Sequence, residues 1–180
     1  MKILYISGSP REKSNTDYLL KLALSITGGQ FVKIIDYQVK PCNACWACQK
    51  LGKCTIDDAM SNVIIPLLLN CDGIVLGSPI YFNNVSAQLK AFMDRTWCIR
   101  GKLKNKIGGA IVVGRKYGAE SAIMAINAFF LKHEMIPANR GVFGIGYSQE
   151  EVLQDIEAIE ATKQLGKRIK EIGEILGLSR

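Results

Sequence analysis

Apolar residues occur along this chain in blocks of two kinds, and the two kinds alternate. Short continuous apolar runs, typical of buried strands, occupy residues 2–7, 31–37, 72–77 and 107–114, and a fifth is expected within 136–145. Apolar residues at helical spacing predict helices within residues 17–26, 59–70, 85–97, 119–135 and 149–176. This alternation predicts an α/β fold with a parallel sheet covered by helices on both faces.

The composition is that of one globular domain. The chain has 180 residues, of which 48% are hydrophobic and 22% charged, and no linker or repeat divides it. We expect a single domain over residues 1–180, interrupted by a cysteine-rich segment at 40–56. No apolar run reaches the length of about eighteen residues that a membrane span needs, and the N-terminus lacks a secretory signal pattern. We therefore expect a cytoplasmic protein with no membrane partner.

The charge of the chain favours acidic partners. There are 23 basic and 16 acidic residues, which give a net charge of +7. The basic residues are scattered, and no helix-turn-helix, zinc-finger or aromatic RNA-binding pattern accompanies them. We expect no nucleic-acid partner.

Two loops that follow predicted strands carry polar residues suited to a ligand, because ligands bind at the carboxyl ends of parallel strands. The first, "SGSPREKSNT", leads into a helix whose free N–H groups attract anions. It fits a phosphate cradle, although simple helix capping by Ser14 or Asn15 explains it equally well. The second places Tyr81 and Phe82 among proline and asparagine residues, which suits a flat ring with polar edges such as a flavin, although core packing is the ordinary explanation.

Four of the six cysteines lie in the segment "PCNACWACQKLGKC", at positions 42, 45, 48 and 54. Closely spaced thiolates of this kind are typical of iron-sulfur ligands, although the final spacing and Thr55 differ from the bacterial ferredoxin motif. Structural zinc is the main alternative, and redox-switch thiols or disulfides are two others. Cys71 and Cys98 are expected in or near the core without chemistry. His133 is expected near a helix C-terminus with a partly positive ring and no catalytic role.

Three segments, at 7–16, 77–95 and 114–120, resemble the flavodoxin-like family of NAD(P)H-dependent FMN reductases. The resemblance implies a doubly wound five-stranded parallel sheet with strand order 2-1-3-4-5. It implies that the FMN phosphate is held by Ser9, Arg11, Ser14, Asn15 and Thr16. It implies that the flavin ring is followed by Pro79, Ile80, Tyr81, Phe82 and Asn83 on one side and closed by Gly114, Arg115 and Tyr117 on the other.

The FMN loops together with the cysteine segment after the second strand resemble the iron-sulfur flavoprotein branch of this family. The resemblance implies FMN and a 4Fe-4S cluster in each chain, the cluster being held by Cys42, Cys45, Cys48 and Cys54. It also implies a homodimer, or a homotetramer built from dimers, in which the cluster of one subunit lies near the flavin of another.

The expected function is that of an FMN-dependent oxidoreductase that transfers electrons. A low-potential donor, such as an acidic ferredoxin, would reduce the cluster and then FMN, which would reduce a small acceptor such as oxygen, peroxide or a quinone. No catalytic side chain is expected, because FMN itself is the reactive group. The alternatives are an NAD(P)H-dependent FMN or quinone reductase without a cluster, and a non-catalytic flavin redox sensor.

Overall fold

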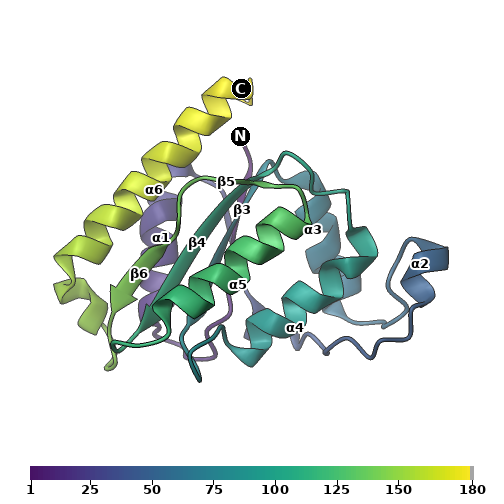
Figure 1. The fold of residues 1–180 in the computed structure, drawn as a ribbon, viewed down its shortest axis with the longest axis horizontal. Coiled ribbons are helices and arrows are strands. Elements are labelled where there is room, and N and C mark those ends of the chain that lie inside the picture. The colour runs from purple at the N-terminus through teal and green to yellow at the C-terminus, as the bar shows by residue number, and fades with distance from the viewer. Residues whose placement is uncertain (179–180) are drawn as a thin grey trace.

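A computed structural model describes residues 1–178, and its centre is a parallel β-sheet (Figure 1). The strands are β1 (Ile3–Ser7), β2 (Gln30–Lys33), β3 (Gly73–Pro79), β4 (Ile107–Gly114), β5 (Ile136–Pro137) and β6 (Val142–Ile145). Their order is β2-β1-β3-β4-β5, and β6 pairs with β4 beyond the end of β5. The predicted flavodoxin-like strand order is therefore confirmed.

Helices cover both faces of the sheet. They are α1 (Asn15–Thr27), α2 (Ala47–Leu51), α3 (Ile65–Asn70), α4 (Ala87–Arg95), α5 (Ala119–Lys132) and α6 (Ile156–Ile175). Buried residues of α1 and α6 pack on one face, and those of α3, α4 and α5 pack on the other. None of the helices within residues 1–178 is long and apolar enough to cross a membrane.

Side chains of the central strands alternate between these two apolar layers. In β1, Leu4 and Ile6 join the layer beneath α3, α4 and α5, whereas Ile3 and Tyr5 join the layer beneath α1 and α6. Because both faces are buried, all five residues of the strand are buried, which explains its continuous apolar run.

Two predicted strands are shorter in the structure than in the sequence pattern. The run at 31–37 forms a strand only to Lys33, because its partner β1 ends at the paired residue Ser7, and a 3₁₀ turn follows. The fifth strand is divided into β5 and β6. Pro137 has no N–H to continue the ladder, and Gly141 has a left-handed backbone, with φ of 120°.

The expected helix over 59–70 begins with a wide π-helical turn, Met60–Ile64, and continues as α3. Pro66 then lies in the first turn of α3, where the missing N–H of proline is tolerated.

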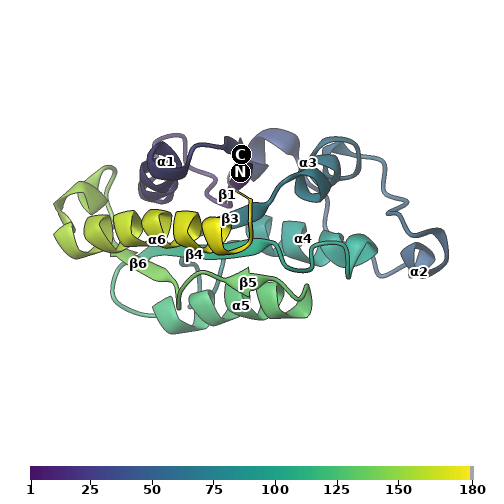
Figure 2. The same cartoon turned by 90° about the horizontal axis from the view of Figure 1, so that it is seen from above.

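The cysteine segment lies outside the layers of the sheet and helices. Both views show the ribbon around α2 extending away from the body of the molecule (Figures 1 and 2). Most side chains from 41 to 53 are exposed, so this segment has little apolar packing of its own.

Candidate functional site

An open pocket of about 220 Å³ lies at the carboxyl ends of β1, β3, β4 and β6. The loops after these strands supply its walls. The lining residues are Ser9, Arg11, Ser14, Asn15, Thr16, Pro79, Ile80, Tyr81, Val113, Gly114, Arg115, Gly146 and Tyr147. The sheet therefore brings together ten of the thirteen residues expected to hold FMN, from three separate loops.

The first loop presents the N-terminus of α1 to the pocket. The side chain of Ser14 caps this helix by accepting hydrogen bonds from the backbone N–H groups of Thr16 and Asp17, at 3.1 and 3.4 Å. Ser14 therefore does cap, and it lines the pocket as well. Arg11 adds a positive charge at the same rim, so the geometry and the charge suit an anion.

A buried ion pair between Lys33 and Asp17 fixes this loop to the end of the sheet. Lys33 binds the carboxylate of Asp17 and the backbone carbonyl of Arg11, and its side chain is only 11% exposed. The hydroxyl of Ser7 donates to the same carboxylate. Because Lys33 ends β2 and Ser7 ends β1, the edge of the sheet sets the position of the loop.

The second loop turns sharply and points two of its expected flavin contacts away from the pocket. Backbone hydrogen bonds of 2.9 and 3.0 Å join Tyr81 and Asn84. Phe82 and Asn83 between them have φ values of 48° and 59°, as in a type I′ turn. Phe82 is fully exposed at the tip of this turn, and neither Phe82 nor Asn83 lines the pocket.

The third loop packs against this turn through a glycine. A Cβ atom on Gly118 would lie 2.5 Å from the Cα of Asn83, so no larger residue fits there, and Gly118 also has a left-handed φ of 83°. Tyr117 beside it is 79% exposed and does not line the pocket, unlike Gly114 and Arg115.

Three lining residues, Val113, Gly146 and Tyr147, were not expected from the sequence. The guanidinium of Arg115 lies 3.5 Å from the ring centre of Tyr147, and Arg11 Nη1 donates to the Tyr147 carbonyl at 3.0 Å. The glycine-rich run ending at Gly146 was the available signal, but it does not open a helix and so does not resemble a nucleotide loop.

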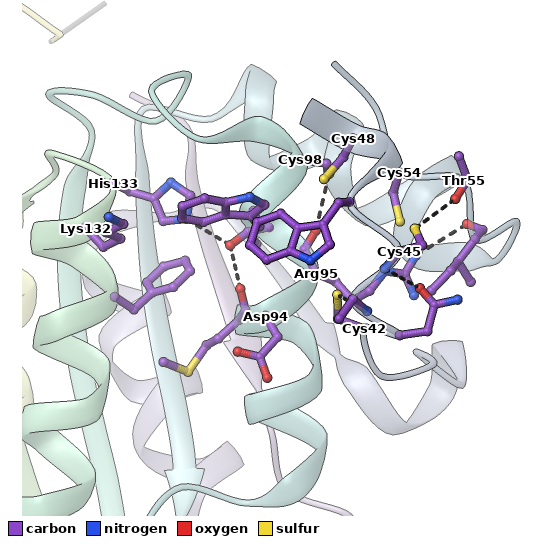
Figure 3. A pocket seen from close by; sticks show the side chains of 18 of the residues that line it. Cys42, Cys45, Cys48, Cys54, Thr55, Asp94, Arg95, Cys98, Lys132 and His133 are labelled. Atoms are coloured by element: carbon purple, nitrogen blue, oxygen red, sulfur yellow. Dashed lines mark hydrogen bonds between the residues drawn. The ribbon is translucent and has the colours of Figure 1, made fainter. Parts of the chain in front are cut away.

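A larger cavity of about 700 Å³ lies beside α4 and α5, and all four clustered cysteines line it (Figure 3). It shares no lining residue with the first pocket. The predicted ligands Cys42, Cys45, Cys48 and Cys54 are free thiols. Cys98 is buried, as expected, yet it also lines this cavity.

The surroundings of two thiols in this cavity move their pKa values in opposite directions. The pKa of Cys45 is lowered by the backbone N–H of Ala47 and by the hydroxyl of Thr55, 3.6 Å from its sulfur. The pKa of Cys98 is raised by burial and by the nearby charges of Cys54 and Cys48. The thiol of Cys45 therefore ionises more readily than an ordinary cysteine, and that of Cys98 less readily.

The sulfur atoms surround the cavity without converging on one point. Among residues 1–178, no group of three or more His, Cys, Asp or Glu side chains is placed to hold a metal ion. A tetrahedral zinc ion with Zn–S bonds of about 2.3 Å would bring its sulfur ligands within about 3.8 Å of each other. The thiols that line the cavity are therefore not gathered around one such ion.

A buried ion pair lies at the base of the cysteine segment. Arg95 Nη1 donates to the carboxylate of Asp58 at 2.7 Å, and the side chains are 0% and 6% exposed. Burial raises the pKa of Asp58, but hydrogen bonds from Arg95, Lys40 and Ser61 outweigh burial and hold this pKa below its usual value. Burial lowers the pKa of Arg95, but Asp58 and the neighbouring Cys54 outweigh it, so both groups are charged.

His133 contradicts the expectation of a partly positive ring. It is 4% exposed and lies against the ring of Phe129, and burial together with the charge of Lys132 lowers its pKa. The hydroxyl of Thr96 donates to the Met93 carbonyl, so His133 Nε2 must carry the proton in its 2.8 Å bond to that hydroxyl. Desolvation therefore outweighs the helix C-terminus, and the ring is neutral.

Comparison with known proteins assigns the chain to a family. The model of the NADPH-dependent FMN reductase family matches residues 1–150. The chain belongs to this family. An iron-sulfur flavoprotein of Methanocaldococcus jannaschii is 38% identical, with 98% of this chain and 99% of that protein covered. An iron-sulfur flavoprotein of Methanosarcina thermophila is 33% identical over 100% and 99% of the two chains.

Within the family, this FMN-dependent oxidoreductase belongs to the iron-sulfur flavoprotein branch. Its fold is shared with distant proteins. The solved structure of RosB with a bound riboflavin phosphate intermediate has a TM-score of 0.82 at 14% identity and covers 99% of this chain and 81% of that one.

The neutral state of His133 predicts a pH-dependent stability. The unfolded ring has a pKa of about 6.5 and the folded ring a lower one, so the unfolded state binds more protons between these values. The contribution is present above about pH 6.5 and is lost as the pH falls toward the folded pKa. His133→Gln is the comparison variant, because its side-chain amide can keep the bond to Thr96. As the pH is lowered through this range, urea unfolding should show a larger fall in the free energy of unfolding for the wild type than for the variant. Parallel pH profiles for the two proteins would contradict the assignment.

Proposed function

We propose that this flavoprotein carries electrons between a 4Fe-4S cluster held by the cysteine segment and FMN held in the pocket at the carboxyl edge of the sheet. The observation that carries the proposal is the presence of two separate pockets, one lined by polar residues at the N-terminus of α1 and the other by four free cysteines. The similarity to iron-sulfur flavoproteins over nearly the whole chain supports it.

The pocket at the sheet edge has the donors and acceptors that FMN needs. The phosphate would bind at the N-terminus of α1 with Arg11 and the hydroxyls of Ser9 and Thr16. Asn15 is 8% exposed, and its Oδ1 atom has no hydrogen-bond partner within residues 1–178, while its Nδ2 donates to the Ser148 carbonyl at 2.8 Å. This buried acceptor suits a ribityl hydroxyl.

The ring would lie between two loops that come from neighbouring strands. Backbone and side chains from Pro79 to Tyr81 form one wall, and Gly114, Arg115 and Tyr147 form the other. Phe82, Asn83 and Tyr117 would approach the ring only from the exposed rim, because they do not line the pocket.

The cysteine cavity has the donors that an iron-sulfur cluster needs. Four free thiols line one cavity, and a cluster spreads its four iron atoms toward separate ligands, whereas zinc draws its ligands to one point. Cys42, Cys45, Cys48 and Cys54 would hold the cluster. Cys98 is buried and its thiol donates to the Arg95 carbonyl at 3.3 Å, so it would face the cluster without binding iron.

The protein would position the two carriers and exclude competing reactions. FMN supplies one- and two-electron chemistry, and a cluster supplies single-electron chemistry. The chain would contribute the loop that begins α1, the apolar residues Met93, Ala125 and Phe129 in the wall of the cysteine cavity, and the positive charges of Arg95 and Lys132 beside it. These charges favour the more negative, reduced state of a cluster.

We propose an acidic ferredoxin as the electron donor, because the chain has a net charge of +7. The acceptor would be a small molecule such as oxygen, peroxide or a quinone. The two pockets share no lining residue, so a homodimer or a homotetramer of dimers, in a cytoplasmic setting, would bring the cluster of one subunit to the flavin of another.

The family description favours a second candidate, an NADPH-dependent FMN reductase whose cysteines have another role. In this candidate the open pocket would admit a nicotinamide beside the flavin, and the cysteine segment would not take part in turnover.

Arg11→Gln should weaken FMN binding about tenfold or more, because it removes one charge-assisted contact to the phosphate. Quenching of FMN fluorescence by apoprotein measures this affinity. Arg168→Gln, which alters an exposed arginine on α6 paired with Glu171, should bind FMN as the wild type does. Equal affinities for all three proteins would remove Arg11 from the site.

Protein purified without oxygen should contain about four irons and four acid-labile sulfides per FMN. Cys54→Ser should lose most of this iron while keeping FMN, since the cysteine lies outside the flavin pocket. Cys71→Ala is the matched control, because Cys71 is buried elsewhere in the core and should leave the iron content unchanged. One zinc per chain, or no metal beside a full complement of FMN, would overturn the cluster.

Reduced ferredoxin and NADPH separate the two candidate functions. We expect reduced ferredoxin to bleach the flavin absorbance of the loaded wild type quickly and to do so slowly in Cys54→Ser. Fast bleaching of both proteins by NADPH, with no response to ferredoxin, would favour the reductase without a cluster. Stopped-flow absorbance under anaerobic conditions measures each rate.

A further inference from the structure

Arg95 has the largest of the fully buried side chains in the described structure, and it lies at the end of α4. Its guanidinium makes two hydrogen bonds to Asp58, of 2.7 and 2.8 Å, in a fork arrangement. It makes three further hydrogen bonds, to the carbonyls of Lys40 and Ile56 and to the hydroxyl of Ser61, at 2.8, 3.4 and 3.1 Å.

These partners lie on the two sides of the cysteine segment. Lys40 immediately precedes residues 41–55, and Ile56 and Asp58 immediately follow them. Asp58 strengthens the same closure, since its carboxylate also accepts the backbone N–H of Lys40 at 3.2 Å. The buried ion pair therefore joins the entry and the exit of the segment to one helix of the fold.

The cysteine segment needs such a closure because it has few other constraints. Its residues are mainly exposed, and α2 is its only helix, with five residues. Only Cys48 and Cys54 among its thiols pack against the hydrophobic core. A loop of this kind samples many conformations, and holding its ends together removes part of that entropy.

A buried ion pair costs desolvation free energy, so its presence calls for a role beyond packing. An apolar side chain, like those of Leu89 and Phe92 in the surrounding layer, would fill this position without the cost of desolvating a charge. The guanidinium instead joins the Lys40 and Ile56 carbonyls at the two segment ends to the hydroxyl of Ser61, and it lies beside Cys54, which a single apolar side chain could not do.

We propose that Arg95 is a positioning residue for the iron-sulfur cluster. With Asp58 it closes the neck of the cysteine segment, which is the place where residue 40 and residues 56–58 meet. This closure holds the four thiols over one cavity and sets the positive charge of Arg95 beside Cys54. The inference rests on the proposed cluster function and goes beyond it, because it assigns the geometry of the ligands to a residue outside the cysteine motif.

The Nε atom of Arg95 gives this residue one further hydrogen-bond donor beside the cysteines. It is buried and has no hydrogen-bond partner within residues 1–178, whereas both terminal nitrogens are used in the neck. In the loaded protein this N–H could donate to Cys54 or to a cluster sulfur, and such a bond would stabilise the reduced cluster.

Arg95→Lys tests the closure, because lysine keeps the charge but cannot bind the two segment ends and Asp58 together. Wild type, Arg95→Lys and the exposed control Arg168→Lys are loaded with iron and sulfide without oxygen, and iron release to a chelator is timed while FMN content is measured. We expect Arg95→Lys to keep its FMN and lose iron about tenfold faster than the other two. Equal release rates in a wild type that holds four irons would overturn the positioning role and leave the proposed function standing.

A wild type that takes up no cluster would overturn the proposed function and this inference with it. If Arg95→Lys does not fold, as absent FMN would show, Asp58→Asn decides in the same assay, because it removes the charge of the pair while keeping its shape. Faster iron loss from Asp58→Asn supports the inference, and wild-type release overturns it.

The reduction potential of the cluster separates positioning from simple structural support. Arg95→Gln removes the positive charge beside Cys54, so the reduction potential of the cluster should shift to more negative values. Arg95→Lys keeps a positive charge, so its cluster potential should stay closer to that of the wild type. The flavin potential should stay unchanged in both variants. Identical cluster potentials in the glutamine variant and the wild type would overturn the placement of the charge.

Discussion

The burial of both faces of the central strands is the constraint on which the rest of this structure depends. Residues of β1, β3 and β4 are almost completely buried, so helices must cover each face of the sheet. Parallel strands then end at one edge, and the loops that follow them meet there. The pocket at the sheet edge is a consequence of this packing, because its walls come from loops that are far apart in the chain.

The two candidate sites of this family member are built on different physical principles. Loops of the proposed FMN pocket continue directly from buried strands, and the ion pair of Lys33 with Asp17 fixes the loop after β1 to the sheet. The cysteine segment buries little apolar surface, since Trp46 and Leu51 are exposed, so polar contacts hold its ends in place. Arg95 and Asp58 supply them from a buried position where water cannot compete.

This division shows how one fold can combine a pocket at the sheet edge with a separate cysteine-lined cavity. The family relationship establishes an FMN-dependent oxidoreductase, and its iron-sulfur flavoprotein relatives match nearly the whole chain. The insertion leaves the strand order of the flavodoxin-like fold unchanged. A segment attached through one neck can therefore acquire ligand chemistry without disturbing the packing that forms the pocket.

Local sequence determined the strand and helix order, the phosphate loop and the compact cysteine motif, because apolar spacing, caps and thiol spacing are encoded by residues near each other. Only the tertiary structure decided the rest. The turn at Phe82 points that ring to solvent, Tyr147 reaches the pocket from a distant loop, and burial makes His133 neutral. The role of Arg95 was equally hidden, since its partners lie 34 to 55 positions away in the chain. Long-range packing determines which side chains are removed from solvent and which distant groups they contact. A short stretch of sequence does not contain this information.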